Sequence, residues 1–133
     1  MSDELTDFDY ELLQGSNFAH VSVNRPDGPP HVTVVWIDAR DGHVLINTAA
    51  GRVKDRLVRR DPRLTVSVHQ EGDAYRWLRV EGTVVEFVTG EEADRHIDFL
   101  NRKYHDGEAW ESTPGQQRVI YRVRPDRILR REE

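Results

Sequence analysis

The sequence has no cysteine, no long apolar run and no close pair of histidines. Without cysteine the chain forms no disulfide and offers no thiol nucleophile or thiolate metal ligand. Its six histidines show no HExxH-like spacing, so we expect no metal site. No stretch of about 18 apolar residues could span a bilayer, and the start lacks the pattern of a signal peptide. We therefore expect a cytoplasmic protein with no membrane partner.

Positive charge is also in short supply, because 24 acidic residues outnumber 19 basic ones and the formal net charge is −5. Nucleic-acid-binding domains are usually basic, so we expect no nucleic-acid partner. Five acids fall in residues 1–15, namely Asp3, Glu4, Asp7, Asp9 and Glu11. This segment is interpreted as a solvated lead-in that carries a short helix ending near Gly15.

Alternating apolar residues and turn signals predict a mainly β fold of the α+β class, in one domain spanning residues 1–133. Tight turns between antiparallel strands favour a small barrel, because closing the sheet removes its exposed edges. The segment 31–39 is apolar on both faces and is expected to be central. Strands are expected at 18–23, 31–39, 44–48, 64–69, 76–88 with a bend at Gly82, 117–124 and, as a short last one, 127–130.

Two helices are expected between the strands. The first follows Arg52 and stops at Asp61–Pro62. The second follows a predicted capping box, Thr89 with Glu92, and ends near Tyr104. Its apolar stripe must lie against the sheet. The stripe consists of Ala93, Ile97, Leu100 and Tyr104.

The most informative stretch is Asn47–Lys54, because positive charge gathers there and just beyond it. Residues 52–63 hold six basic side chains against two acids. A threonine and a glycine followed by cations offer hydroxyl, amide and charged donors to a phosphate ester. On a regular helix Arg52 and Lys54 would lie roughly 200° apart, so both can reach one anion only if the helix begins after Arg52, at or near Lys54.

Four blocks in order carry a resemblance to a known family. They are Gly28-x-Pro30-His31-Val32-Thr33-x-x-Trp36, Asn47-Thr48-Ala49-x-Gly51-Arg52-x-Lys54, Arg59-Arg60-Asp61-Pro62-Arg63, and Tyr75-Arg76-Trp77 leading to Glu81-Gly82. Together they resemble the split β-barrel flavin and deazaflavin oxidoreductases of the pyridoxamine-phosphate-oxidase-like superfamily, and most of all the branch that uses coenzyme F420. The resemblance covers roughly residues 18–123.

The resemblance implies a six-stranded antiparallel split β-barrel with two to three helices, which forms a homodimer with two cofactor sites at the subunit interface. Thr48, Arg52 and Lys54 would bind the cofactor phosphate and the edge of its ring. Val34, Val35, Trp36 and Asn47 would line the ring, and Trp77 would come from the partner chain. Two departures concern ring contacts: Val34 stands where relatives often have proline, and Leu57 where they often have asparagine.

The expected activity is hydride transfer between reduced F420 and a small conjugated or carbonyl substrate, with Lys54 as the catalytic residue that stabilises charge at the pyrimidine end of the ring. FMN is the alternative cofactor. A non-catalytic carrier and a polyanion-binding module on residues 52–63 are further alternatives.

Each candidate side chain also has a purely structural interpretation. Arg52 and Lys54 could be a solvated helix face paired with Asp55 and Asp61, and Trp36 could belong to the core. Trp110 is a candidate lid residue. His31 and Tyr75 are weak candidates for a proton donor.

Overall fold

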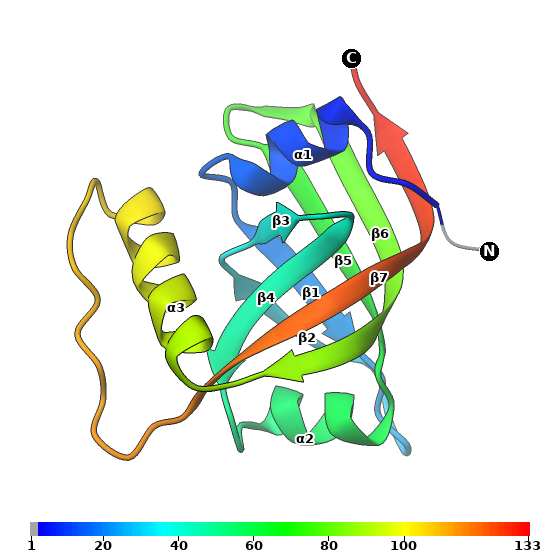
Figure 1. Ribbon diagram of the computed structural model, residues 1–133. Coiled ribbons are helices and arrows are strands. Elements are labelled where there is room, and N and C mark those ends of the chain that lie inside the picture. The colour runs from blue at the N-terminus through cyan, green and yellow to red at the C-terminus, as the bar shows by residue number, and fades with distance from the viewer. Residues whose placement is uncertain (1–2) are drawn as a thin grey trace.

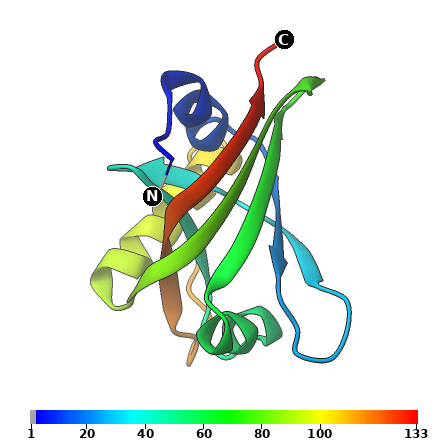
Figure 2. The same ribbon diagram turned by 90° about the vertical axis from the view of Figure 1, so that its right-hand side faces the viewer.

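Seven strands form one antiparallel sheet in the computed structural model, which describes residues 3–133. The strand order is β2-β1-β5-β6-β7-β4-β3, and the sheet curls into a half-barrel with helices at its ends and side (Figures 1 and 2). This confirms a mainly β fold. The elements are α1 (Asp7–Gln14), β1 (Ala19–Val23), β2 (His31–Val35), β3 (Asp38–Arg40), β4 (His43–Ala49), α2 (Val53–Arg60), β5 (Arg63–Gln70), β6 (Asp73–Val88), α3 (Glu91–Tyr104) and β7 (Arg118–Arg131).

The predicted central strand 31–39 is wrong. The chain leaves the sheet at Trp36–Ile37, so the segment becomes two short strands, β2 and β3, at opposite edges of the sheet. Helix α3 satisfies the backbone at this break: the Ile37 N–H donates to the Tyr104 hydroxyl at 3.1 Å, and the Ile37 carbonyl accepts from Lys103 Nζ at 2.6 Å. An apolar run on both faces therefore reflects a crossing. The sheet has seven strands, whereas the family resemblance implied six.

The predicted bend at Gly82 is confirmed. The β6–β7 register shifts between Glu81 and Gly82, and a Cβ at position 82 would lie 2.5 Å from Val123 Cγ1 and 2.7 Å from the Arg124 carbonyl oxygen. Glycine is required there because β7 passes too close for any side chain. The two strands expected at 117–124 and 127–130 are instead one, β7, which continues through the same bulge.

Helix α2 begins at Val53 and ends before Asp61–Pro62, as expected, with Arg52 extended at φ −68° and ψ 164°. The buried stripe on α3 is confirmed for Ala93, Ile97 and Leu100, whereas Tyr104 is only half-buried. The predicted capping box is wrong, because the residue before α3 is Gly90 at φ 81° and no side chain caps the helix. No helix within residues 3–133 is both long enough and apolar enough to cross a membrane.

Four of the five acids in the N-terminal segment are exposed, as expected, namely Asp3, Glu4, Asp7 and Glu11. Helix α1 ends at Gly15 as predicted, but it buries Phe8, Leu12 and Leu13 against the barrel core. Asp9 has no exposed surface and lies in a two-pronged ion pair with Arg130 of β7. The three apolar residues are spaced for one face of a helix, and this spacing could have predicted their burial. Counting only the acidic residues of the segment missed it.

Candidate functional site

Seven of the eight predicted site residues line one cavity of about 250 Å³ beside the start of α2. They come from the end of β2, the crossing segment after it, the end of β4 and the start of α2. The eighth, Trp77, lies elsewhere on β6. The lining consists of Phe18, Val34, Val35, Trp36, Asn47, Thr48, Arg52, Lys54, Ile97, Trp110 and Arg118.

Three cations meet at this cavity without a carboxylate partner among residues 3–133. Lys54 is only 8% exposed and makes no hydrogen bond or ion pair there. Burial, followed by the positive charges of Arg52 and Arg118, lowers the pKa of Lys54 to about 8. Burial and the charge of Arg52 likewise lower the pKa of Arg118 to about 10. The three close positive charges repel one another, so a bound anion would stabilise the cluster.

The hydroxyl of Thr48 is the second unusual group at the cavity. Thr48 is 2% exposed, and its Oγ1 has no hydrogen-bond partner within the described residues. An unpaired buried hydroxyl costs about 1–3 kcal/mol, so such groups usually serve a ligand or a water. Hydroxyl and cations together are the donor set that a phosphate ester uses.

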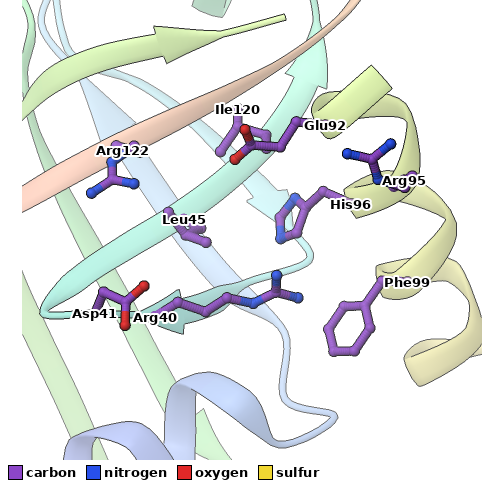
Figure 3. A pocket seen from close by; sticks show the side chains of 9 residues that line it. All are labelled: Arg40, Asp41, Leu45, Glu92, Arg95, His96, Phe99, Ile120 and Arg122. Carbon is purple, nitrogen blue, oxygen red and sulfur yellow. The ribbon is translucent and has the colours of Figure 1, made fainter. Parts of the chain in front are cut away.

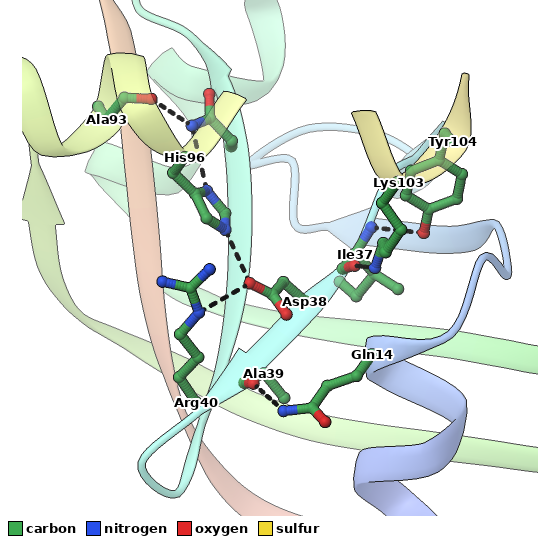
Figure 4. Close-up of polar contacts among 10 residues, drawn as sticks. Gln14, Ile37, Asp38, Ala39, Arg40, Ala93, His96, Lys103 and Tyr104 are labelled. Carbon is green, nitrogen blue, oxygen red and sulfur yellow. Dashed lines mark hydrogen bonds and ion pairs between the residues drawn. The ribbon is translucent and has the colours of Figure 1, made fainter. Parts of the chain in front are cut away.

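Asn47 is held in place by Ala93 and His96 of α3, which are labelled in Figure 4, and it in turn holds Arg118. Its amide nitrogen donates to the Ala93 carbonyl at 2.9 Å and faces His96 Nδ1 at 3.2 Å. Because a carbonyl only accepts, the amide orientation is fixed, and Nδ1 must be the accepting nitrogen of a neutral ring. The His96 proton therefore lies on Nε2 and donates to Asp38 at 3.0 Å. The Asn47 oxygen accepts from Arg118 Nε at 2.9 Å.

Asp38 anchors this relay of side chains. Burial opposes its ionisation, but hydrogen bonds from His96 and the Ala39 amide, with the charge of Arg40 nearby, hold the pKa of Asp38 below its usual value. Asp38 and His96 are 2% and 4% exposed. The relay runs Asp38–His96–Asn47–Arg118 and delivers a fixed guanidinium to the cavity.

Aromatic rings form one wall of the cavity. Trp36 stacks on Tyr104 with centroids 5.4 Å apart and meets Trp110 edge to face at 6.2 Å. Trp110 is fixed by its backbone N–H, which donates to Asp98, and by the Arg118 guanidinium 5.4 Å from its ring centre. A planar ring system could lie against this wall. The lid role of Trp110 stays a prediction.

Asp55 and Asp61 do form ion pairs with basic residues, as the structural interpretation suggested. Their partners, however, are not the expected Arg52 and Lys54. Asp55 and Asp61 pair with Arg59 and Arg63, at 3.1 and 2.9 Å. Asp55 also accepts from the Tyr121 hydroxyl and the Gly51 amide. The alternative in which these two acids neutralise Arg52 and Lys54 is therefore wrong.

Sequence reasoning missed Arg118, His96 and Asp38. Arg118 follows a long loop and begins the last strand, and no neighbouring residue marks it as part of a site. His96 and Asp38 are 58 residues apart, and only the packing of α3 on β3 and β4 brings them together. The one local signal was a histidine at the edge of the apolar stripe of α3.

Trp77 lies on the outer face of the sheet. It is opposite His69 of β5 and two residues from Arg79, and Arg79 is the residue in register with Ser67, His20 and Val34. Three strand spacings of roughly 4.8 Å separate these strands, so Trp77 cannot reach the cavity of its own chain. Neither His31 nor Tyr75 lines the cavity.

Comparisons with known proteins agree with this fold. The sequence profile of the pyridoxamine 5'-phosphate oxidase family matches residues 5–131. A solved structure named F420 Reductase is 30% identical, with a TM-score of 0.77 over 90% of this chain and 95% of that one. A conserved hypothetical protein from Mycobacterium tuberculosis is 26% identical, with a TM-score of 0.74 over 92% and 81% of the two chains. A putative pyridoxamine 5'-phosphate oxidase from Listeria innocua, 17% identical with a TM-score of 0.59 over 85% and 86%, shares the fold. No curated protein matches the sequence.

Proposed function

Because the chain belongs to the pyridoxamine 5'-phosphate oxidase family, we propose that it is an oxidoreductase that binds coenzyme F420 and transfers a hydride between it and a small conjugated or carbonyl substrate. The family fold is a scaffold for flavin-type cofactors. The similarity to a protein named F420 Reductase favours the deazaflavin over FMN.

The observation that carries the proposal is the set of unpaired donors around the cavity. Arg52, Lys54 and Arg118 lack a carboxylate partner within residues 3–133, and the buried hydroxyl of Thr48 lacks any partner. A phosphate satisfies all of them at once, since its oxygens accept several charge-assisted hydrogen bonds. A helix face packed only for stability would not retain an unpaired lysine that is 8% exposed.

The other lining residues fit a planar redox ring. When bound, a reduced deazaflavin supplies a hydride to an electrophilic carbon. The ring would lie between β2, with Val34 and Val35, and the aromatic wall at Trp36. Lys54 keeps its proton below about pH 8 and so offers an ammonium group to negative charge that develops at the ring edge.

A second copy of the chain would complete the site. The cavity of about 250 Å³ is smaller than the usual 300–1,000 Å³ of an organic-ligand pocket. The outer sheet face beside it exposes Val32 and Val34, at 56% and 59%, and the same face carries Trp77 and Leu129. Two such faces packed about a two-fold axis would bring Trp77 of one chain toward Val34 of the other.

Cofactor titration tests the proposal. The apoprotein is mixed with F420 and, separately, with FMN while tryptophan fluorescence is followed, and light scattering gives the number of chains. We expect tighter binding of F420, quenching of Trp36 and a two-chain particle. Tight binding of FMN with none of F420 would reject the deazaflavin assignment. Tight binding of F420 without turnover of enones, quinones and aldehydes would identify a carrier instead.

Replacement of His96 tests the relay behind Arg118. His96→Leu removes both ring nitrogens, so Asn47 loses one anchor and Arg118 is less well placed. We expect cofactor affinity to fall about 10-fold. His96→Gln keeps an acceptor for Asn47 and a donor for Asp38, so it should restore most of the affinity. Titration of both variants is the measurement, and equal affinities would mean that the relay positions nothing in the cavity.

A further inference from the structure

A cavity of about 490 Å³ lies between α3 and the segment 105–117, which connects α3 to β7. We call it the loop cavity. It shares two lining residues, Trp110 and Arg118, with the proposed cofactor site. The cavity shown in Figure 3, on a different face of α3, shares none with that site, and its three arginines are already paired with carboxylates. The loop cavity is therefore the one placed to take part in the same reaction.

The connecting segment is held at both ends and stands off α3 between them (Figure 1). Near its start the Trp110 N–H donates to Asp98 of α3 at 2.8 Å. At its end the Gln117 carbonyl accepts from the Ala50 N–H at 2.8 Å. Between these anchors, residues 111–115 make no hydrogen bond to α3 or to the sheet within residues 3–133. The fixed ends therefore hold the cavity open.

The ring of Trp110 borders both cavities. It meets Trp36 of the cofactor site edge to face, with ring centres 6.2 Å apart, and it also lines the loop cavity. The Arg118 guanidinium lies 5.4 Å from the ring centre and steadies it. A flat conjugated molecule in the loop cavity can stack on this ring. Such a molecule would lie directly beside the space proposed for the cofactor ring.

The charges around the loop cavity disfavour an anion. Its lining holds two acids, Asp94 and Asp98, and one base, Arg118, while segment 105–117 adds three acids and no lysine or arginine. Asp98 is paired with Arg102 at 2.8 Å, and Arg118 is one of the cations that a cofactor phosphate would neutralise. Asp94 is exposed and forms no ion pair or hydrogen bond within residues 3–133. It would repel an anionic ligand, whereas a hydroxyl group can donate to it.

An uncharged donor is also present in the lining. The Gln116 side-chain oxygen accepts from Arg118 Nη1 at 3.1 Å, so the amide nitrogen of Gln116 is turned to other partners. This nitrogen makes no hydrogen bond among the described residues and can donate to a carbonyl oxygen. Ser112 and Thr113 add hydroxyl groups. The loop cavity thus combines a flat apolar wall, a carboxylate acceptor and an amide donor.

We propose that the loop cavity is the substrate site of the oxidoreductase, and that it takes an uncharged, planar conjugated carbonyl compound carrying a hydroxyl group. The conjugated body stacks on Trp110, the hydroxyl donates to Asp94, and the carbonyl oxygen accepts from Gln116. Asp94 sets the specificity, because it accepts from the hydroxyl and repels an anion. The assignment as a substrate site rests on the proposed function, whereas binding in the loop cavity can be measured without any cofactor.

The test is a titration of the full chain, without cofactor, with para-hydroxybenzylideneacetone at about pH 6, where its phenol is uncharged. Methyl NMR signals of Thr113 and Ile97 report on the two cavities, because Thr113 lines the loop cavity and Ile97 the cofactor cavity. We expect a saturable shift of Thr113 and none of Ile97. The para-methoxy analogue lacks the donor and should bind about 10-fold more weakly. The para-carboxy analogue is an anion and should not bind.

Asp94→Asn is expected to weaken binding of the para-hydroxy compound about 10-fold and to allow the para-carboxy analogue to bind. Glu92→Gln is the matched control, because Glu92 is another exposed acid in the first turn of α3 but lies outside the loop cavity. It should leave both affinities unchanged. Failure to saturate, a shift of Ile97 in place of Thr113, equal binding of the para-methoxy analogue, or equal effects of the two variants would each overturn the proposal.

A second titration, with F420 present, separates this proposal from the proposed function. With F420 bound, Thr113 should still shift, because the two cavities have only Trp110 and Arg118 in common. Displacement of the enone by F420 would overturn the assignment as a substrate site. Failure of F420 to bind at all would instead reject the proposed function, and with it the redox role of the enone, while the cofactor-free titration would still decide whether the loop cavity binds it.

Discussion

Replacement of Lys54 by methionine is expected to stabilise the protein and at the same time remove much of its cofactor affinity. Methionine is unbranched like lysine and one heavy atom shorter, so it fills most of the same space without a charge. The pKa of Lys54 falls from 10.5 to about 8 on folding, and each unit corresponds to 1.36 kcal/mol, so the buried ammonium costs the folded state on the order of 3 kcal/mol. Cofactor affinity should fall on the order of 10- to 100-fold, since one charge-assisted contact to the phosphate is lost.

The pH dependence distinguishes this effect from a general change in packing. Below pH 8 the lysine is protonated in both the folded and the unfolded chain, and the full cost is present. Between about pH 8 and 10.5 only the unfolded chain keeps the proton, so stability of the native sequence rises with pH and the advantage of methionine shrinks. Affinity for the cofactor phosphate should fall over the same pH range, because Lys54 loses its charge there.

Urea unfolding at several pH values, together with cofactor titration, measures both effects. Arg56→Met is the control, because Arg56 is exposed on the same helix and makes no ion pair within residues 3–133. It should change the free energy of unfolding by less than about 0.5 kcal/mol and leave affinity unchanged. A Lys54→Met variant that is less stable, or that binds as tightly as before, would show that Lys54 is a structural residue.

The parts of the site that local chemistry encodes could be predicted from the sequence. The extended Arg52 and the helix that starts at Val53 follow from the need to point two cations the same way, and the structure has this geometry. Asp61–Pro62 ends α2 because proline cannot continue a helix. Gly82 marks the bend because β7 leaves no room for a Cβ.

The parts of the site and fold that depend on contacts between distant residues could not be predicted from the sequence. Segment 31–39 has the alternation of one strand, and only α3, some 65 residues later, supplies the partners that let Ile37 leave the sheet. Arg118 enters the site through Asn47, 71 residues away. Thr89 and Glu92 have capping-box spacing, yet Gly90 precedes the helix and the box is not formed. Short motifs state what a segment can do, whereas tertiary partners decide among the possibilities.

The acidic N-terminal segment illustrates the same limit in energetic terms. Asp9 was one of five acids in a charged run, but folding buries it completely against Arg130, with contacts of 2.9 and 2.8 Å. The same carboxylate accepts the Thr6 N–H, and the Thr6 hydroxyl accepts the Asp9 N–H, which forms a capping box for α1. One buried charge therefore fixes both the start of the helix and its attachment to β7.

Arg130→Met is consequently expected to destabilise the protein by about 3–5 kcal/mol, because it leaves the Asp9 carboxylate buried without a counter-charge. Such a loss lowers the melting temperature on the order of 10 °C for a domain of this size. The double variant Asp9→Leu/Arg130→Met removes both charges and should recover most of the loss, since an apolar pair replaces a buried ion pair at little cost. Thermal and urea unfolding of the single and double variants give the coupling energy.

Arg131→Met is the neighbouring control for this experiment. Arg131 is exposed, and its Nε donates only to the Glu133 backbone carbonyl within residues 3–133. Its replacement should change the free energy of unfolding by less than about 1 kcal/mol. If Arg130→Met cost no more than Arg131→Met, α1 would be held by its apolar residues alone. A large cost confined to Arg130 would instead mean that an ion pair, which the charge pattern gave no reason to expect, ties the first helix to the last strand.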